Sequence, residues 1–163
     1  MQVRPATHGD AEALADIYNH YIGATHVTFD VDPVDADDRR RWLGAHATGR
    51  HRALVAVEDV RVVGFASSGP WRPRAAYATS IETSVYCAPD AVGRGIGRAL
   101  YEALFGALDG EEVHRAYAGI AMPNEASVAL HERFGFKQVA YFSEQGRKLG
   151  RYWDVAWFEK RLD

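Results

Sequence analysis

Val92-Gly93-Arg94-Gly95-Ile96-Gly97-Arg98 places glycines at alternate positions between a run typical of a strand and a run typical of a helix. Glycine adopts positive φ angles at little cost, so such a turn can aim several backbone N–H groups at one anion. The N-terminus of the following helix adds a favourable dipole. The stretch alone leaves two interpretations open, a cradle for a pyrophosphate group or an ordinary tight turn.

Three common glycine-rich motifs do not fit this stretch. The dinucleotide-binding motif G-x-G-x-x-G needs a third glycine, which here falls on Arg98 or Leu100. The P-loop needs a Gly-Lys pair followed by serine or threonine, which is absent. A kinase glycine-rich loop lies between two strands of a much longer chain. The residues on either side of this stretch are therefore needed to distinguish a pyrophosphate cradle from an ordinary tight turn.

Outward from the turn, apolar residues recur with the period of a strand or of a helix. We expect helices that begin near Thr7, near Asp35, after Gly97 and at Asn124. We expect strands over residues 2–5, 53–58, 61–67, 81–87, 113–122, 136–143 and 153–160. This order, β-α-α-β-β-β-α-β-α-β-β, predicts a single domain over residues 1–163 with an α/β (α+β) fold, in which a mixed sheet carries helices on both faces.

Composition limits the possible partners. The 163 residues carry a formal net charge of −3, whereas nucleic-acid-binding domains usually have a basic excess, so we expect no nucleic-acid partner. No apolar stretch has the length of a membrane-spanning helix or follows Met1 as a secretion signal does, and Cys87 is the single cysteine. We therefore expect a cytoplasmic protein with no membrane partner. No histidine, cysteine or carboxylate cluster has metal-ligand spacing, so we expect no metal.

The strand, the glycine-rich turn and the following helix together resemble the coenzyme A site of the GNAT superfamily of acetyltransferases. The superfamily consensus is Arg/Gln-x-x-Gly-x-Gly/Ala; Gly95 and Gly97 match it, whereas Val92 departs from its first position. A cradle built mainly from backbone amides tolerates that departure. A capping asparagine, Asn124, and a helix that ends in Gly135-Phe136 match a second signature.

The resemblance narrows to the phosphinothricin N-acetyltransferase family, because short motifs match it in order along essentially the whole chain. These motifs are Tyr18-Asn19-His20-Tyr21-Ile22, Gly69-Pro70-Trp71-Arg72, Arg74 with Tyr77, Glu82-Thr83-Ser84-Val85-Tyr86, Pro123-Asn124 with Ser127 and His131-Glu132, and Trp153-Asp154-Val155. The resemblance implies the GNAT fold, with a central mixed and mostly antiparallel sheet. It also implies direct transfer of an acetyl group from acetyl-CoA to the amine of a small anionic acceptor, such as phosphinothricin or methionine sulfoximine or sulfone.

The same resemblance assigns the coenzyme A contacts. It implies that the strand ending at Cys87 pairs through its backbone with the pantetheine arm, and that the Val85 N–H is a candidate oxyanion donor. The residues assigned to the cofactor are Val85, Tyr86, Cys87, Gly93, Arg94, Gly95, Ile96, Gly97, Arg98 and Asn124. Cys87 itself is predicted to be a small packed residue rather than a nucleophile, because no histidine is obviously paired with it.

Glu82 is the candidate general base, acting on the amine directly or through a water. Side chains alternate along a strand, so Glu82, Ser84 and Tyr86 share one face. A carboxylate among apolar strand residues is costly unless it is paired or used. The resemblance favours catalysis, and a salt-bridged structural glutamate is the alternative.

His131 is the second catalytic candidate. At helical spacing Asn124, Val128 and His131 share one face, so Asn124 and His131 can both point toward the cofactor. Many GNAT enzymes carry a tyrosine here that protonates the leaving thiolate, and His131 could replace it or be packed and hydrogen-bonded instead. Expelling a thiolate with a pKa near 8.5 costs only about 2 kcal/mol at neutral pH, so this acid is dispensable. Asn124 could be the helix N-cap, a cofactor contact or both.

An aromatic and basic loop is predicted to select the acceptor. Arginine presents a planar fork that suits carboxylate or phosphinate oxygens, and aromatic neighbours can wall a pocket. The residues that the resemblance assigns to the acceptor are Phe29, Trp71, Arg72, Arg74, Tyr77 and Thr83. Solvated surface charge is the alternative for the two arginines. A protein N-terminus or another amine remains as a second acceptor class, although an arginine pair argues against a cationic one.

Residues 146–153 predict a glycine-bounded hairpin with exposed aromatic side chains. In relatives of this type the terminal strands help to form a homodimer, so the resemblance implies a dimer, with a simple surface hairpin as the alternative.

A non-catalytic acyl-CoA-binding module is the alternative to an enzyme, and it is suggested by Val92 at the first consensus position. The presence of Glu82, Asn124 and His131 argues against it.

Overall fold

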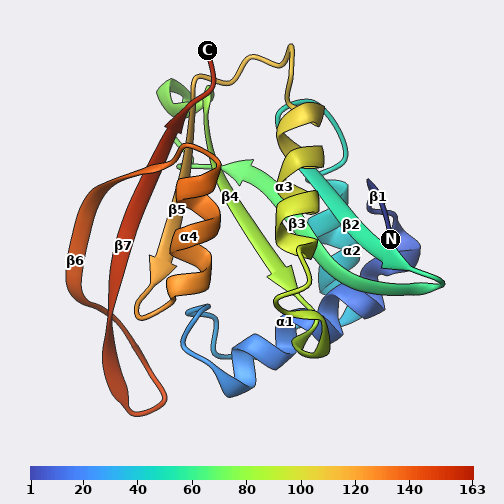
Figure 1. The fold of residues 1–163 in the computed structure, drawn as a ribbon, viewed down its shortest axis with the longest axis horizontal. Helices are drawn as coiled ribbons and strands as arrows, with labels where there is room; N and C mark the ends of the chain where they lie inside the picture. Colours follow the sequence, from blue (N-terminus) through green and yellow to red (C-terminus); the bar gives the residue numbers. More distant parts are fainter.

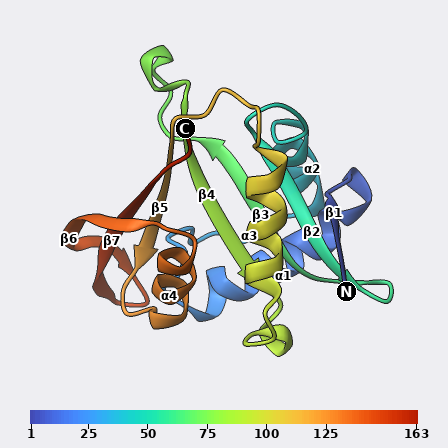
Figure 2. The same cartoon turned by 45° about the horizontal axis from the view of Figure 1, so that its top comes forward.

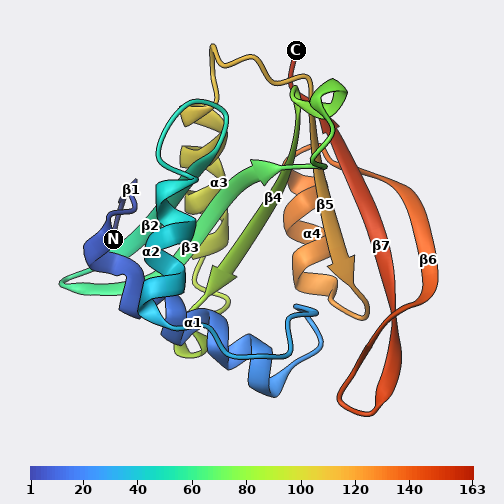
Figure 3. The same cartoon turned by 180° about the vertical axis from the view of Figure 1, so that it is seen from behind.

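The computed structural model describes residues 1–163 and joins their strands in one seven-stranded sheet of order β1-β2-β3-β4-β5-β7-β6. The strands are β1 (Gln2–Pro5), β2 (Arg52–Glu58), β3 (Arg61–Pro70), β4 (Ser80–Cys87), β5 (Arg115–Ala121), β6 (Lys137–Lys148) and β7 (Arg151–Arg161). The helices are α1 (Ala11–Ala24), α2 (Ala36–Gly44), α3 (Ile96–Ala107) and α4 (Glu125–Arg133). Helices α1 and α2 cover one face of the sheet, and α3 and α4 cover the other (Figures 1 and 3).

The predicted order of helices and strands is confirmed, as is the mixed, mostly antiparallel sheet. Every neighbouring pair is antiparallel except β4 and β5, which are parallel. The boundary expected at Ser67 was wrong, because β3 continues to Pro70. Its last residues still pair with β4, with Gly69 opposite Glu82.

The terminal hairpin is longer than predicted. Strand β6 was expected to end at Ser143, but it runs to Lys148 because an irregularity between Phe142 and Gly146 absorbs the extra residues and pairing with β7 then resumes. The turn at Leu149-Gly150 has positive φ angles of 53° and 75°. Such angles fit a tight hairpin whose twist matches that of its strands.

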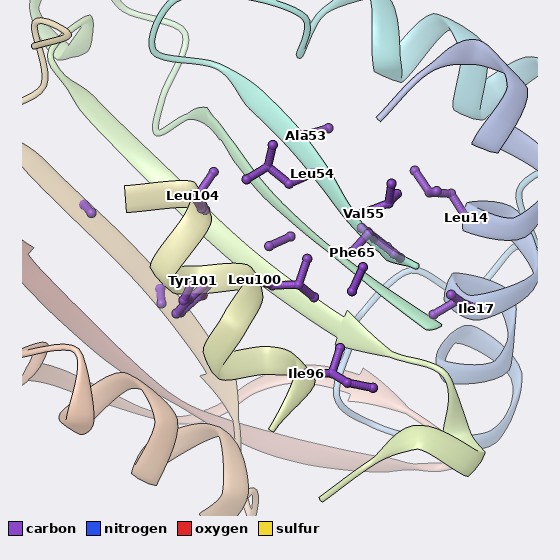
Figure 4. Close-up of a cluster of buried hydrophobic side chains, with 14 of the residues drawn as sticks. Leu14, Ile17, Ala53, Leu54, Val55, Phe65, Ile96, Leu100, Tyr101 and Leu104 are labelled. Atoms are coloured by element: carbon purple, nitrogen blue, oxygen red, sulfur yellow. The ribbon is translucent and has the colours of Figure 1, made fainter. Parts of the chain in front are cut away.

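Apolar side chains fill both faces of the central strands (Figure 4). Helix α3 buries Ile96, Leu100 and Leu104 against one face, and α1 buries Leu14 and Ile17 against the other. Each such side chain stabilises the fold by about 1.5–3 kcal/mol on full burial. The core therefore holds both helix layers in place against the strands that carry the site.

The sheet opens in its middle. The two parallel strands β4 and β5 pair only from Ser80 to Glu82, opposite Arg115 to Tyr117. Beyond these residues they diverge, as Figure 2 shows, and the remaining part of β4 is bonded only to β3. The edge of β4 that faces β5 is consequently free of strand pairing from Thr83 to Cys87.

None of the helices is both long and apolar enough to cross a membrane.

Candidate active site

Two cavities lie at the gap between β4 and β5. The first, the α1–α2 cavity, has a volume of about 650 Å³ and is lined by residues that include Tyr18, Trp42 and Glu82. The second, the α3–α4 cavity, has a volume of about 430 Å³ and is lined by residues that include Gly95 and His131. Both cavities are lined by Val27, Ser84, Tyr86, Gly119 and Ala121. The shared lining comes largely from β4 and β5, so the cavities meet where these strands separate.

The glycine-rich turn forms one end of the α3–α4 cavity. Gly93 and Gly95 both have φ of 81°, and no protein atom lies within 4 Å of a Cβ built on either of them. Gly95 is the N-cap of α3 and, as a glycine, offers no side chain to cap the first amides of this helix. An open backbone at an uncapped helix N-terminus fits the diphosphate of coenzyme A.

Gly97 has a different role from the two glycines before it. A Cβ on Gly97 would lie 3.2 Å from a methyl group of Leu130 in α4. This glycine therefore allows α3 and α4 to approach each other closely. The turn thus combines two positive-φ positions with one packing position.

Most residues assigned to the cofactor line one cavity. Those that line the α3–α4 cavity are Val85, Tyr86, Cys87, Gly93, Gly95, Ile96, Gly97, Arg98 and Asn124. Arg94 does not line it, because its guanidinium donates to the Glu58 carboxylate at 2.7 Å. Val92, which departs from the consensus, is part of the same lining.

Glu82 faces the α1–α2 cavity, and its carboxylate has no hydrogen bond or salt bridge to a protein group. Burial raises the pKa of this carboxyl, and the positive charge of Arg72 partly opposes the shift. The alternative of a salt-bridged structural glutamate does not describe this geometry. A half-buried carboxyl with a raised pKa beside a cavity has the properties of a general base.

His131 lies at the edge of the α3–α4 cavity but is only 3% exposed. Its Nδ1–H donates to the Ser127 carbonyl at 2.7 Å, and its Nε2 lies 2.9 Å from the Tyr101 hydroxyl. Burial lowers the pKa of His131 and keeps the ring neutral. With both nitrogens bonded within the protein, the packed alternative describes His131 better than the role of acid.

Asn124 has both of the properties considered for it. Its side-chain oxygen accepts a hydrogen bond from the Ser127 N–H at 3.2 Å, which caps α4, and the residue also lines the α3–α4 cavity.

Cys87 is half-buried, and burial raises the pKa of its thiol. A raised thiol pKa disfavours the thiolate that a nucleophile needs.

The structure does not bring all of the residues assigned to the acceptor together in one cavity. Phe29 and Arg72 line the α1–α2 cavity, with the Arg72 guanidinium 4.5 Å from the ring of Trp71. Trp71 itself stacks on Tyr117 beside the cavity. Those outside the α1–α2 cavity are Trp71, Arg74, Tyr77 and Thr83. Thr83 is buried on the opposite face of β4, where it lines the α3–α4 cavity.

Several residues of the α1–α2 cavity were not among the sequence candidates. They are Tyr18, Thr28, Trp42, His46, Gln145 and Trp157. The Tyr18 hydroxyl lies 2.8 Å from that of Thr28 and donates to Asp30 at 2.6 Å, which ties α1 to the loop after it. The helical spacing of Tyr18 indicates a core residue, and only its place in the motif Tyr18-Asn19-His20-Tyr21-Ile22 could have singled it out.

The loop that carries Thr28 and Phe29 is held from the far side by the terminal hairpin. The Lys148 ammonium donates to the carbonyls of Thr28 at 2.8 Å and Tyr21 at 3.2 Å. A Cβ on Gly146 would lie 2.2 Å from the ring of Phe29, so β6 needs a glycine at this point.

No group of three or more histidine, cysteine or carboxylate side chains is placed to hold a metal ion.

Comparison with known proteins defines the class. Residues 14–136 match the model of the Acetyltransferase (GNAT) family. An acetyltransferase from Salmonella typhimurium, solved with its cofactor acetyl-CoA, superimposes with a TM-score of 0.95 and 34% identity over 99% of this chain and 94% of its own. The chain belongs to the GNAT acetyltransferase family, and it is an acetyl-CoA-dependent N-acetyltransferase.

Curated relatives narrow the comparison. A phosphinothricin N-acetyltransferase from Streptomyces coelicolor is 54% identical over 99% of this chain and 96% of its own length. An L-methionine sulfoximine/L-methionine sulfone acetyltransferase from Pseudomonas paraeruginosa is 34% identical over 99% of this chain and 94% of its own. The predicted resemblance to the phosphinothricin N-acetyltransferase family is confirmed.

Proposed function

We propose that this enzyme acetylates the amine of small, anionic, amino-acid-like acceptors of the phosphinothricin and methionine sulfoximine or sulfone type. One observation carries the proposal. The unpaired carboxylate of Glu82 faces a cavity that meets, between β4 and β5, a second cavity ending in the glycine-rich turn. An acceptor amine in the first cavity and a thioester in the second would come together at this gap.

Each side of the gap has a separate task in this proposal. Bound acetyl-CoA supplies an activated acetyl thioester, with its diphosphate at Gly93 to Arg98. Glu82 takes the proton of the acceptor ammonium, directly or through a water, and the raised pKa of its carboxyl brings it closer to that of an amine. The free edge of β4 supplies the Val85 N–H as donor to the acetyl oxygen.

Transfer is direct in this proposal, without an acetylated enzyme. Cys87 is disfavoured as nucleophile because burial raises the pKa of its thiol. His131 is neutral and bonded at both ring nitrogens, so it positions Tyr101 and α4 rather than donating a proton. The coenzyme A thiolate can leave unprotonated at a cost of about 2 kcal/mol.

Arg72 is the contact for the acceptor's anionic group in this proposal. It is the arginine that lines the α1–α2 cavity, whereas Arg74 does not reach the lining. Phe29, Trp42 and Trp157 supply apolar walls for the carbon chain of the acceptor. The names of the two curated relatives support an acceptor of this size and charge.

We also propose a cytoplasmic homodimer formed through the terminal strands. Strand β6 is the edge of the sheet, and large apolar side chains on the hairpin are about half exposed: Val139, Tyr141, Phe142, Leu149 and Tyr152. An exposed apolar edge strand is a natural pairing surface. Light scattering coupled to size exclusion should give twice the mass of 18.1 kDa, and a monomeric mass at assay concentrations would contradict the dimer.

The acceptor proposal is tested by release of free thiol from acetyl-CoA. The panel contains phosphinothricin, methionine sulfoximine, methionine sulfone, methionine and an amine-terminated peptide. We expect the highest kcat/KM for acceptors that carry a tetrahedral or anionic group at the end of a short side chain. Preference for the peptide would indicate a protein N-terminus as acceptor. Binding of acetyl-CoA without thiol release from any amine would indicate a non-catalytic module.

A further inference from the structure

The indole of Trp157 in β7 lies over a glycine of β5. Gly119 and Trp157 are direct partners in the register of these two strands, and both line the α1–α2 cavity. A Cβ built on Gly119 would lie 2.7, 2.9 and 3.0 Å from Cη2, Cζ3 and Cζ2 of the six-membered ring of Trp157. Contacts this short are too close for a real Cβ. The indole therefore occupies the space that a side chain at position 119 would fill.

This placement brings the ring beside the junction of the two cavities. Glu82 and Tyr117 are the last paired residues of β4 and β5, and two residues further along each strand come Ser84 and Gly119. Ser84 and Gly119 line both cavities, whereas Trp157 lines only the α1–α2 cavity. In the proposed function the acceptor amine has to reach this junction to meet the thioester. Trp157 is therefore a wall beside the amine end of the acceptor.

Further contacts hold the indole in this place. Its Nε1–H donates to the Gln145 side-chain oxygen at 3.3 Å. Its ring meets that of Trp71 nearly at a right angle, with 5.0 Å between the centroids, and Trp71 in turn stacks on Tyr117 at 4.4 Å. Aromatic pairs in these arrangements are favourable beyond the area that they bury. Rotation of the indole to admit a bulky group would break these contacts, so Trp157 is a firm wall.

We propose that Trp157, lying in the space left by Gly119, is a specificity-determining residue that selects acceptors unbranched at the carbon next to the amine-bearing carbon. Phosphinothricin, methionine sulfoximine and methionine sulfone all carry a CH2 group at this carbon. A methyl branch there lies three bonds from the nitrogen, so it cannot avoid the walls of the junction. This inference rests on the proposed function, and it adds a limit on the shape of the acceptor to the requirement for a charged or tetrahedral group.

Thiol release from acetyl-CoA with three related acceptors measures this selectivity. Methionine sulfone is the reference, β-methylmethionine sulfone carries the branch, and ethionine sulfone is an unbranched isomer of the branched compound. For the wild type we expect kcat/KM of the branched acceptor to lie about 10-fold or more below that of ethionine sulfone, which is the discrimination that one misplaced methyl group gives in an apolar pocket. Because the two compounds are isomers, the ratio of their kcat/KM values reports shape and not size.

Three variants change the wall in different ways. Trp157→Leu replaces the indole by a smaller apolar side chain and should bring the ratio for the two isomers close to one, by raising kcat/KM for the branched acceptor. Trp157→Phe keeps a smaller ring and should narrow the ratio less. Gly119→Ala keeps the indole but forces it out of its place. It should lower kcat/KM for methionine sulfone by about 10-fold or more in the wild-type background, and much less in the Trp157→Leu or Trp157→Phe background.

Phe105→Leu is the matched control, because Phe105 packs against aromatic rings of α3 and α4 and lines neither cavity. It should lower Tm and leave the isomer ratio unchanged. Should Trp157→Leu not fold, Trp157→Phe decides the matter in its place. A ratio near one in the wild type, an unchanged ratio in the Trp157 variants, or an equal effect of Gly119→Ala in every background would overturn the role of Trp157. Absence of acetyl transfer to any of the three acceptors by the wild type would instead overturn the proposed function.

Discussion

At Glu82 the deprotonated form that the proposed catalysis needs is also the form that burial destabilises. Burial raises the pKa of its carboxyl, and Arg72 opposes the shift. The folded protein therefore binds this proton more tightly than the unfolded chain does, and stability falls as the pH rises from the ordinary glutamate pKa through the raised one. At neutral pH the charged carboxylate destabilises the fold, yet the same deprotonated form is the one that can act as a base.

Replacement of this carboxyl by an amide separates the two effects. We expect Glu82→Gln to lower kcat at pH 7 by about 100-fold or more, to leave acetyl-CoA affinity near normal and to raise Tm. In the wild type, kcat/KM should increase with pH through a limb that lies above the ordinary glutamate pKa. Stopped assays across pH and a thermal melt check both statements. A variant with the wild-type rate would remove Glu82 from the mechanism.

The two arginines of the loop after β3 are expected to behave differently. Only Arg72 lines the α1–α2 cavity, so Arg72→Ala should raise KM for anionic acceptors by about 10-fold or more, in line with 1.5–3 kcal/mol for a hydrogen bond to a charged group. Arg74→Ala is the matched control and should stay near wild type. Steady-state kinetics with an anionic and an uncharged acceptor are the measurement. Equal losses for both acceptors would contradict a charge contact at Arg72.

Among the structural elements, the glycine-rich turn before α3 depends on the left-handed backbone conformation of Gly93 and Gly95. We expect Gly95→Ala to raise KM for acetyl-CoA by about 10-fold or more, because a left-handed conformation costs a non-glycine residue about 1–2 kcal/mol and its Cβ would project into the cradle. Gly106→Ala, near the exposed end of the same helix and without positive φ, is the control. Calorimetry with acetyl-CoA should show weaker binding for the first variant only. Unchanged affinity in Gly95→Ala would show that the turn does not hold the diphosphate.

The elements were largely predictable from the sequence because their signals are local. Alternation along β4 is enough to put Glu82 and Ser84 on one face and Thr83 on the other, but it does not say which cavity each face meets. Thr83 was assigned to the acceptor, and only the packing of α3 and α4 on its side of the sheet puts it against the other cavity.

Loop residues were the least predictable part of the site. Tyr77 belongs to a short 3₁₀ turn, Ala75–Tyr77, that carries it away from the cavity despite its nearness in sequence to Arg72. His46 has no periodic pattern around it, and its ring is positioned by the stack on Trp42 and by the missing side chain of Gly69. Such positions follow from tertiary contacts, which no spacing rule contains.

At the scale of the whole molecule, the terminal hairpin and the loop after α1 meet although they are far apart in sequence (Figure 3). Lys148 is 6% exposed and makes no salt bridge; its ammonium is bonded to two backbone carbonyls, those of Tyr21 and Thr28. Burial lowers the pKa of this ammonium. Because Thr28 lines the α1–α2 cavity, the last strands of the chain shape a cavity that Glu82 of β4 also lines.

Lys148→Met tests this long-range coupling with a side chain of similar length that cannot donate. The Thr28 carbonyl loses its partner, at about 1–3 kcal/mol if it stays buried, whereas the Tyr21 carbonyl keeps its bonds from the N–H and hydroxyl of Thr25, so Tm should fall. The loop should also loosen around Thr28, so KM for the acceptor should rise while acetyl-CoA affinity, set on the other face of the sheet, stays near normal. Lys137→Met, at the exposed start of β6, should change neither quantity. A lower Tm with an unaltered acceptor KM would mean that the hairpin supports the fold without shaping the acceptor cavity.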